Sequence, residues 1–309
     1  MRVLVATNLY PTPDRPTYGA FVEEQVRSLV ARGLEIEVLH LLRPGRRSRY
    51  LWGPIAIERA MRRFRPDVIH AHYGLTGALA VRQRSVPVVV TYHGSDVTVP
   101  WQRRISRFAA RRAAANLVVA EPQRALLGAP RTQVVPCGVD PTVFHPQSRE
   151  EARARLGLDP SEPWILFAGA FANPVKNYTL LQAALERAPQ RAVRVKEIAG
   201  MTRAEVASWM AAVDALVLTS HREGSPQVVK EALFCGLPVI GVPVGDVVDR
   251  IGGIDGCRVV DPEPSAVRAA IDDVLSRRAR IQLMDEQLAE FRLDRIAERI
   301  EAIYSEVMR

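Results

Sequence analysis

Lysine is nearly absent from this sequence and occurs only at Lys176, Lys196 and Lys230. Residues 1–150 hold no lysine, 22 arginines and 11 acidic residues, so the formal net charge of +8 comes from the first half of the chain. The arginines cluster at Arg43, Arg46, Arg47, Arg49, Arg59, Arg62, Arg63, Arg65, Arg103, Arg104, Arg107, Arg111 and Arg112. Such a surface binds anionic lipid headgroups or a phosphate-bearing acceptor, or it is merely solvated. Nucleic acid is disfavoured because no recognised motif and no interleaved aromatic residues accompany the charge.

Cysteine is also scarce. The three cysteines, Cys137, Cys235 and Cys257, are odd in number and are scattered without the spacing of metal ligands. This pattern excludes a disulfide framework and favours a reduced compartment with buried, structural thiols.

Long apolar runs are missing as well. A membrane-spanning helix needs about 18 or more consecutive apolar residues, and the sequence has no such run. Arg2 leads directly into the strand-like Val3–Ala6 rather than into an apolar targeting segment. We therefore expect neither a spanning helix nor a cleaved signal, and a cytoplasmic protein that is either free or peripheral at the inner face of the membrane.

Two common ligand motifs are absent. The loop after the first strand, residues 8–20, lacks the G-x-G-x-x-G pattern, which argues against a Rossmann oxidoreductase with a nicotinamide cofactor. The sequence has no Asp-x-Asp pair, so we predict no metal site and no cofactor.

Alternating strands and helices are what the sequence does contain. Short apolar runs at residues 3–6, 36–41, 67–70, 87–92 and 116–119 alternate with helical patterns, and the alternation resumes after residue 163. This order specifies parallel sheets covered on both faces, and 309 residues exceed the usual size of one core. The fold class predicted is α/β, with two Rossmann-like domains facing a central cleft, at residues 1–145 and 146–309.

The second domain is predicted to be shortened. Only about 37 residues separate Lys176 from Asp214, which leaves room for one strand between two helices. The last stretch, 280–309, is charged and helical, with Ile296, Ile300, Ile303 and Tyr304 on one apolar stripe. Its last helix is a candidate to pack back on the N-terminal domain.

The segment from Leu218 to Asp246 combines most of the chemistry. A buried strand, residues 215–218, is followed by a polar loop, then a helix that Gly236 ends, then another strand. Glu223 lies just before the helix and Glu231 about two turns into it, so both carboxylates can reach the crevice beside the helix N-terminus, which attracts anions.

Five stretches together resemble one known family. His221–Ala232 resembles the E-x7-E segment of the family 4 (group 1) retaining glycosyltransferases, whose fold is GT-B. Within this family the segment is most similar to the branch that includes teichuronic-acid-type cell-envelope glycan transferases. Four further stretches agree in order along nearly the whole chain. They are residues 67–72, 91–96, 134–140 and 167–177.

The resemblance implies roles for individual residues. Glu223, Lys176 and His93 are the implied catalytic residues: Glu223 would hold donor-sugar hydroxyls, Lys176 the leaving diphosphate, and His93 would face the transferred sugar. The implied donor-binding residues are Gly19, Gly169, Asn177, Gly224, Ser225 and Glu231, with Glu231 on the ribose hydroxyls. Asp96, Gly138 and Arg222 are candidates for the acceptor side or for an undecided role. A transferase of this kind needs positive, preorganised donors where charge builds on the phosphate.

Each role has a structural alternative. The carboxylates could be helix-surface acids, Lys176 a solvated cation and His93 a core histidine, while His70 and His72 are expected to be structural. One departure from the family pattern concerns the diphosphate: Ala170–Ala172 follow Gly169 where the family has an arginine. Arg222 or another cation could replace it, or the phosphate is held less strongly.

The predicted function is a metal-independent retaining transfer of a hexose-type sugar from a nucleotide diphosphate sugar, the donor substrate, to an envelope glycan or lipid-linked acceptor. The expected partners are the nucleotide sugar, this acceptor and an anionic membrane contacted by the Arg-rich N-terminal domain, with no nucleic acid. The alternative is a catalytically weak sugar-nucleotide or glycan-binding paralogue that partners another transferase.

Overall fold

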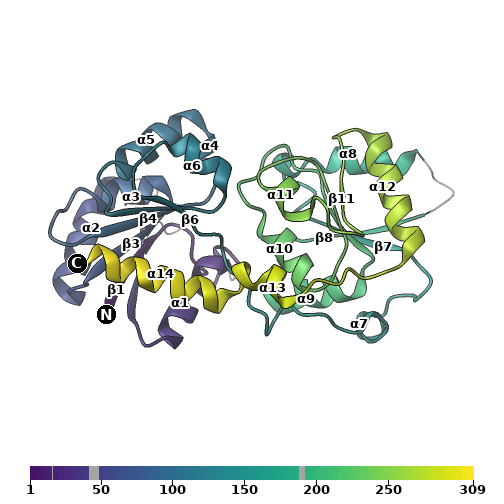
Figure 1. The fold of residues 1–309 in the computed structure, drawn as a ribbon, viewed down its shortest axis with the longest axis horizontal. Helices are drawn as coiled ribbons and strands as arrows, with labels where there is room; N and C mark the ends of the chain where they lie inside the picture. Colours follow the sequence, from purple (N-terminus) through teal and green to yellow (C-terminus); the bar gives the residue numbers. More distant parts are fainter. Residues whose placement is uncertain (16, 42–48, 188–191) are drawn as a thin grey trace. The chain divides into compact units, whose positions relative to one another are not determined.

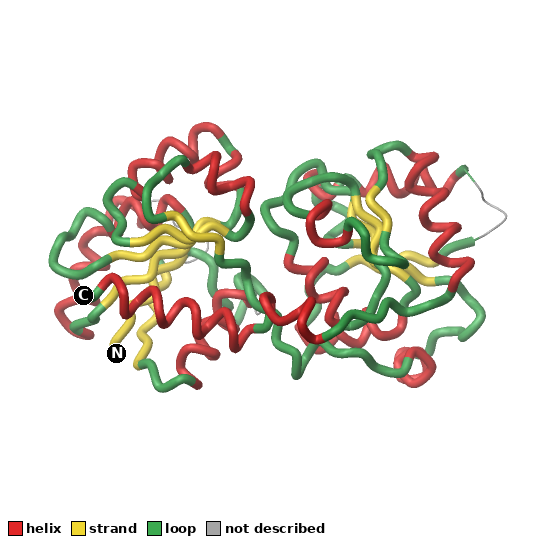
Figure 2. Tube along the Cα trace, in the orientation of Figure 1, coloured by secondary structure: helices red, strands yellow, loops and turns green. Residues whose placement is uncertain are grey.

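The computed structural model describes residues 1–15, 17–41, 49–187 and 192–309. The chain divides into two compact units, shown in Figures 1 and 2. Unit 1 comprises Met1–Gly138 together with Leu293–Arg309, and unit 2 comprises Val139–Arg292. Each unit has its own parallel sheet and its own core.

Unit 1 is built on a six-stranded parallel sheet in the order β2-β1-β3-β4-β5-β6. Its strands are β1 (Arg2–Thr7), β2 (Glu35–His40), β3 (Val68–His72), β4 (Val88–Tyr92), β5 (Ala115–Val118) and β6 (Thr132–Val134). Its helices are α1 (Ala20–Ala31), α2 (Arg49–Phe64), α3 (Gly74–Ala80), α4 (Ser95–Thr98), α5 (Pro100–Ala110), α6 (Glu121–Leu127) and α14 (Leu293–Val307).

The two faces of this sheet carry different helices. On one face α1 and α14 pack side by side and bury Val22, Leu29, Ile296 and Ile300 against the strands. On the other face α2, α3, α5 and α6 cover the sheet. Strands buried on both faces read as continuous apolar runs, which is why the sequence pattern identified them. The apolar stripe of the last helix is buried as predicted, and it lies in unit 1.

Unit 2 is built on a five-stranded parallel sheet in the order β11-β10-β9-β7-β8. Its strands are β7 (Trp164–Phe167), β8 (Arg194–Glu197), β9 (Ala215–Leu218), β10 (Val239–Gly241) and β11 (Arg258–Val259). Its helices are α7 (Arg149–Leu156), α8 (Tyr178–Glu186), α9 (Arg203–Ala212), α10 (Gln227–Phe234), α11 (Val247–Ile251), α12 (Pro264–Arg277) and α13 (Asp285–Leu288), with single 3-10 turns at Pro174–Lys176 and Ala289–Phe291. In the part of unit 2 that is described, β8 is the one strand between α8 and α9, so this unit is short as predicted.

Two expectations need correction. The boundary between the units falls after Gly138, not after His145, because Val139 and Phe144 are buried in the core of unit 2. The stretch 280–309 is not one helix: residues 279–284 have no helical turn, and an extended Arg292 separates the 3-10 turn Ala289–Phe291 from α14. The Arg292 backbone forms a parallel bridge with Val139, which explains why the helix stops there.

Strand order reverses once in each sheet, and this places a crevice at a defined point. In unit 1 the chain moves from β1 to β2 on one side and then returns to β3 on the other side of β1. In unit 2 it moves from β7 to β8 and returns to β9 beside β7. Ligands of open α/β sheets bind outside the carboxyl ends of the strands at such switch points. The loops after β1 and β3, and those after β7 and β9, are therefore the places to look for sites.

Candidate functional site

Lys176 and Glu223 meet at the switch point of unit 2. Lys176 lies in the loop after β7 and Glu223 in the loop after β9, and the Lys176 Nζ donates to Glu223 Oε1 over 2.7 Å. The Ser220 hydroxyl donates to the same oxygen over 2.7 Å. No described residue contributes a hydrogen bond to Oε2 of Glu223. An ammonium group has three N–H donors, so Lys176 can hold this carboxylate and a phosphate oxygen together.

The loop that carries Lys176 is fixed from two sides. A Cβ at Gly169 would lie 2.6 Å from Cγ of Lys176, so glycine is required for the lysine stem to pass. The Thr219 hydroxyl contacts the carbonyls of Lys176 and Asn177, at 3.0 and 2.9 Å. Asn177 has a left-handed conformation, with φ of 54°, that asparagine tolerates better than most residues, and it begins α8. The lysine is thus positioned by the sheet and not by a free loop.

The start of α10 rests on a buried polar network. The Ser225 hydroxyl donates to Asp246 Oδ2 over 2.8 Å, and Arg250 pairs with the same oxygen at 2.9 Å. Lys230, only 1% exposed, donates to Ser225 Oγ over 3.3 Å. A Cβ at Gly245 would lie 2.8 Å from the Gly224 carbonyl oxygen, so this neighbouring loop packs directly against Gly224. The backbone N–H groups of Gly224 and Ser225 are therefore held rigidly beside the helix N-terminus, an anion-binding position.

Sequence reasoning missed this network. It assigned no role to Lys230 or Asp246. Their partners come from the loop after β10 and from the first turn of α11, a proximity that no short-range signal encodes. The helix itself follows the prediction: Cys235 caps it and Gly236, with φ of 66°, ends it.

Glu231 is held by a partner that the sequence did not reveal. It is only 2% exposed, and Arg203 donates to its Oε1 over 2.7 Å. Arg203 opens α9, which begins with a capping box formed by Thr202 and Glu205. The guanidinium of Arg203 also lies over the ring of Phe144, 4.6 Å from its centroid. The family resemblance implies that Glu231 binds the ribose hydroxyls of the donor, and that role stays a prediction.

The position of the missing arginine is occupied by aromatic side chains. Phe171 stacks on Tyr178 with centroids 3.9 Å apart, and the Phe171 N–H donates to Glu197 over 2.5 Å. Arg222, proposed as a substitute cation, is exposed in the loop before Glu223. The charged group bonded beside this aromatic pair is thus an acidic one, Glu197, and Lys176 is the cation that the loop after β7 contributes.

His93 lies in unit 1 at the end of β4, within a chain of histidines. Its Nε2 lies 3.0 Å from Nδ1 of His72, and its Nδ1 lies 3.8 Å from the Cys137 thiol. The rings of Phe21 and Tyr73 pack on it, at 4.9 and 4.7 Å. His93 is thus oriented from several sides while staying partly exposed.

His70 and His72 are fully buried, which suits the structural role expected for them. His70 bonds Tyr304 of α14 over 2.5 Å and Thr91 of β4 over 2.7 Å. Burial lowers the pKa of His70 far below its ordinary value and lowers the pKa of His72 to about 3. Both rings are therefore neutral in the folded protein at neutral pH.

Asp96 organises the turn after β4. Its carboxylate accepts the N–H groups of His93, Gly94 and Gly74, at 3.1, 2.9 and 3.1 Å. Burial raises the pKa of Asp96 to about 6, against the opposing effect of these N–H donors. The geometry makes Asp96 a residue that positions the His93 backbone.

Gly19 and Gly138 are tightly packed. A Cβ at Gly19, which has φ of 77°, would lie 2.5 Å from the Leu9 carbonyl carbon. A Cβ at Gly138 would lie 2.7 Å from the Leu293 Cα at the start of α14. Gly19 lies in the turn before α1, and Gly138 packs against the start of α14. A ligand role for either stays a prediction.

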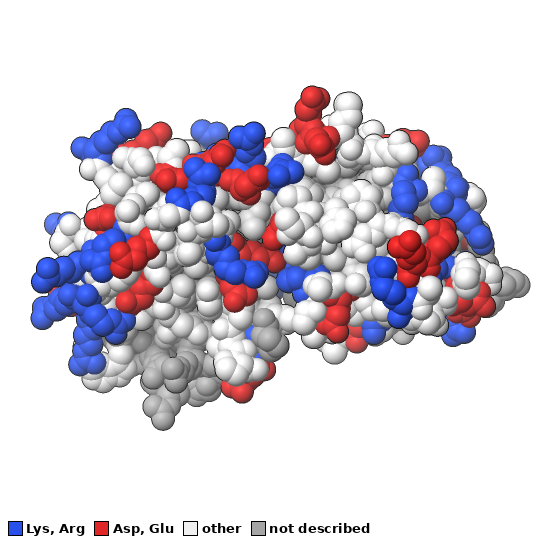
Figure 3. Space-filling view, turned by 90° about the horizontal axis from the view of Figure 1, so that it is seen from below, with Lys and Arg blue, Asp and Glu red and all other residues white. Residues whose placement is uncertain are grey.

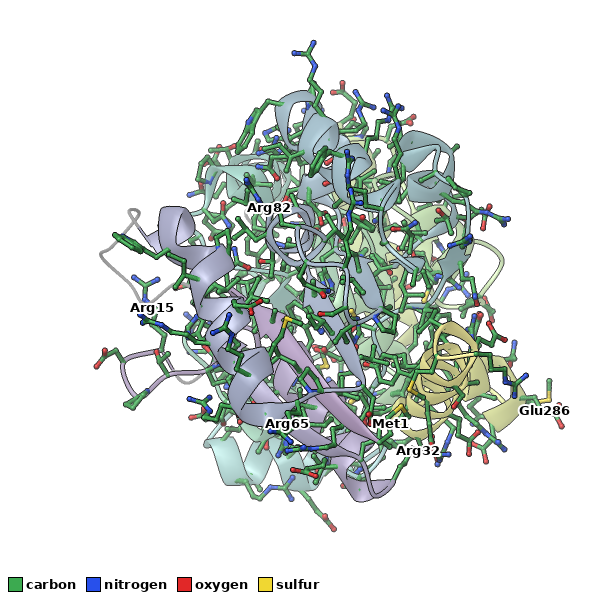
Figure 4. The ribbon with its side chains drawn as sticks, turned by 90° about the vertical axis from the view of Figure 1, so that its left-hand side faces the viewer. Met1, Arg15, Arg32, Arg65, Arg82 and Glu286 are labelled. Carbon is green, nitrogen blue, oxygen red and sulfur yellow. The ribbon has the colours of Figure 1, made fainter. Side chains whose placement is uncertain are left out.

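Charge on unit 1 is widely distributed. Figure 3 shows basic side chains at its outer edge with acidic ones between them, and Figure 4 shows Arg15, Arg32, Arg65 and Arg82 spread around its surface. Arg43, Arg46, Arg47 and the Arg49 side chain lie outside the described residues. Within the described ranges no three His, Cys, Asp or Glu side chains gather as metal ligands. No helix in those ranges is both long and apolar enough to cross a bilayer.

Comparisons with known proteins match both units. A profile described as Glycosyltransferase Family 4 matches residues 2–143, and one described as Glycosyl transferases group 1 matches residues 183–277. A teichuronic acid biosynthesis glycosyltransferase, TuaC of Bacillus subtilis (strain 168), is 27% identical over 82% of this chain and 83% of its own length. A D-inositol 3-phosphate glycosyltransferase of Segniliparus rotundus is 30% identical over 72% of this chain and 61% of its own length.

Solved structures agree on the fold. Sucrose-phosphate synthase from Thermosynechococcus elongatus superposes with a TM-score of 0.84 at 19% identity, covering 99% of both chains. Anabaena Alr3699/HepE, in complex with UDP and glucose, gives 0.77 at 15% identity, covering 98% of this chain and 99% of that one. With the profile matches and the two parallel-sheet units, these findings show that the chain belongs to the family 4 and group 1 glycosyltransferases and has the GT-B fold.

Proposed function

We propose that this glycosyltransferase moves a hexose-type sugar from a nucleotide diphosphate sugar to an envelope glycan or a lipid-linked acceptor, with retention at the anomeric carbon and without a metal. The observation that carries the proposal is the Lys176–Glu223 pair, 2.7 Å apart at the switch point of unit 2. The name of TuaC supports a cell-envelope acceptor. The names of the D-inositol 3-phosphate glycosyltransferases support glycosyl transfer in general, and the UDP and UDP-glucose complexes of HepE support a nucleotide-sugar donor.

The reaction breaks the bond between the anomeric carbon and a phosphate oxygen and forms a bond from that carbon to the acceptor oxygen on the same face. The acceptor proton passes to the leaving phosphate, so no protein nucleophile is required. Lys176 and the N–H groups of Gly224 and Ser225 would stabilise the negative charge that builds on the diphosphate. Oε2 of Glu223 would accept hydroxyl groups of the donor sugar, and Glu231 those of the ribose.

The test compares Glu223→Gln and Lys176→Ala with the wild type. Each change removes a preorganised contact worth roughly 2–4 kcal/mol of barrier, so kcat/KM should fall about 30- to 1000-fold. Lys196→Ala is the matched control, because Lys196 lies over the Trp209 ring and not at the switch point. NMR of the product anomer should show the configuration of the donor; an inverted product would exclude the retaining mechanism.

The donor is identified by a thermal-shift screen with UDP, GDP, ADP and their sugars. A nucleotide at about a hundred times its Kd stabilises a protein by roughly 2.7 kcal/mol, which is readily measured. Nucleotide binding without turnover over a broad donor and acceptor panel would favour the second candidate, a weakly catalytic paralogue that partners another transferase. The aromatic and acidic side chains in place of the family arginine motivate that candidate.

Peripheral contact with an anionic membrane belongs to the same proposal. Arg104, Arg111 and Arg112 are exposed on and beside α5, and Arg112 lies over the ring of the exposed Phe108, 4.1 Å from its centroid. Exposed arginine beside exposed aromatic surface suits a headgroup layer.

A further inference from the structure

Unit 1 contains a cavity at its own switch point. It has a volume of about 430 Å³ and is lined by the loops after β1 and β3, by α4 and by the first turns of α5. Lining residues include Asn8, Leu9, Tyr18, Tyr73, Trp101 and Gln102. The cavity therefore occupies the position in this sheet that Lys176 and Glu223 occupy in the sheet of unit 2.

The lining combines flat aromatic surface with neutral hydrogen-bonding groups. Trp101 is 60% exposed and Tyr18 is 43% exposed, so both rings are accessible to a ligand from solvent. The amides of Asn8 and Gln102 and the hydroxyl of Ser95 lie on the same lining. Aromatic rings of this kind present apolar faces to the C–H face of a sugar ring, while amides and hydroxyls bond its hydroxyl groups.

One lining residue of the cavity, Tyr73, has a strained backbone. Tyr73 has φ of 73° and ψ of 144°, a conformation that non-glycine residues rarely adopt. Two backbone hydrogen bonds hold this conformation: the Tyr73 N–H donates to the Thr91 carbonyl over 2.8 Å, and the Gly77 N–H donates to the Tyr73 carbonyl over 2.9 Å. Its ring packs on His93, 4.7 Å between centroids. The strained residue thus joins the cavity to the histidine that the resemblance places at the transferred sugar.

The charge of the lining differs from that of the unit 2 site. Among the described residues that line the cavity there is no lysine, arginine or histidine. Its one carboxylate, Asp96, is buried and accepts backbone N–H groups. The guanidinium of Arg15 lies 5.8 Å from the Tyr18 ring centroid, outside the lining. Nothing in this lining offers the charged donors by which proteins hold a phosphate.

We propose that this cavity binds an uncharged sugar ring of the acceptor, stacked on Trp101 and hydrogen-bonded by Asn8 and Gln102. The inference rests on the proposed function and narrows its acceptor class to glycans whose accepting residue carries no phosphate. A charged group farther along the acceptor would then bind outside this cavity, at arginines on the surface of unit 1.

The experiment measures sugar binding directly, by saturation-transfer NMR on the full chain. Methyl α-D-glucopyranoside, methyl β-D-galactopyranoside and lactose are compared with glucose 6-phosphate, each at roughly 10 mM, about tenfold above a 1 mM Kd. We expect saturation transfer to the ring C–H groups of at least one neutral sugar, and at least tenfold weaker binding of glucose 6-phosphate.

Substitutions of tryptophan test whether the neutral sugar binds in this cavity. Trp101→Ala should weaken neutral-sugar binding tenfold or more, and Trp101→Phe should restore part of it. Trp52→Ala is the matched control, since Trp52 is 62% exposed on α2 and does not line the cavity. Because Trp101 is mostly exposed, its removal leaves the core intact, and an unchanged melting temperature checks this.

Three results would overturn the inference: no transfer to any neutral sugar, binding that survives Trp101→Ala, or tighter binding of glucose 6-phosphate. Hydrolysis of the donor nucleotide sugar is followed in the same samples. Absence of hydrolysis by the wild type would contradict the proposed function. Hydrolysis that continues in Trp101→Ala while sugar binding is lost would support a separate sugar site in unit 1.

Discussion

At the scale of single residues, the buried cation Lys230 is the least expected feature of α10. Charged side chains are almost never fully buried unless they are paired. The Lys230 ammonium bonds Ser225, which bonds the buried carboxylate of Asp246. The lysine thereby ties the first turn of α10 to the loop that carries Glu223, the loop that would hold the diphosphate in the proposed function.

Lys230→Met should lower the free energy of unfolding by about 1–3 kcal/mol, because it leaves buried polar partners unsatisfied. Urea unfolding curves measure the change. The control is Lys196→Met, where only the contact with Trp209, 5.1 Å from Nζ to the ring centroid, is lost. A contact of that kind contributes about 0.5–1 kcal/mol. Equal effects of the two changes would show that the network around Ser225 is not important for stability.

The buried histidines predict how stability depends on pH. In the folded chain the pKa of His72 is about 3, and that of His70 is also lowered. An unfolded histidine has a pKa near 6.5, so both contribute stability above about pH 6.5 that is lost as the pH falls toward 3. Asp96 acts oppositely between about pH 4 and 6, because its pKa is raised to about 6. The two histidines change the free energy of unfolding more than the single carboxyl group does, so the protein should lose stability as the pH is lowered from 7 to 5.

Replacement of His72 tests this account. In His72→Gln the loss of stability between pH 7 and pH 5 should shrink by about 2 kcal/mol, at roughly 1.4 kcal/mol per pH unit. Urea unfolding at the two pH values provides the measurement. His221→Gln, which replaces an exposed histidine, is the matched control. An unchanged pH dependence in His72→Gln would mean that another group controls it.

At the scale of elements, α14 completes unit 1 from the far end of the chain. Ile296, Ile300 and Ile303 are buried with α1, and Tyr304 reaches the fully buried His70. One whole face of the sheet therefore depends on a segment that follows unit 2 in the sequence. Removal of this helix would expose a large apolar area, at roughly 25 cal/mol per Å².

A deletion of residues 293–309 should leave unit 1 unfolded or aggregated while unit 2 stays folded. Limited proteolysis with mass spectrometry would then recover a protected fragment within 139–292 and none within 1–138. A deletion of Met308 and Arg309 alone is the matched control, because neither is buried. Full protection of residues 1–138 in the longer deletion would contradict this assignment of α14.

Sequence reasoning located strands and longer helices because both depend on local pattern. The inner strands of both sheets, such as β1, β3, β4, β7 and β9, are buried on two faces and read as apolar runs. Short helices were missed: α4 and α11 have too few residues for a periodicity to show. For the candidate site, the E-x7-E spacing led to the prediction of Glu223 and Glu231. It could not reveal Arg203 or Asp246, since these meet the site only through the order of the strands.

At the scale of the whole molecule, the excess of arginine in the first half leads to a binding prediction. The purified protein should sediment with vesicles that contain anionic lipid and be released as salt is raised, since the Debye length falls from about 10 Å at 0.1 M to about 3 Å at 1 M. Arg104→Glu with Arg111→Glu should weaken sedimentation, whereas Arg187→Glu with Arg278→Glu, exposed in unit 2, should not. Equal recovery with neutral and anionic vesicles at low salt would refute the idea.

The shortened sheet of unit 2 also bears on solubility. Strand β8 is the last in its sheet, so one row of its backbone N–H and C=O groups has no strand beside it. Such edges invite pairing with another chain, and proteins protect them with charge. The four residues of β8 are Arg194, Val195, Lys196 and Glu197. Three of these four side chains are charged, and one of them is one of the three lysines in the sequence, so this edge carries the kind of residues that oppose strand pairing between chains.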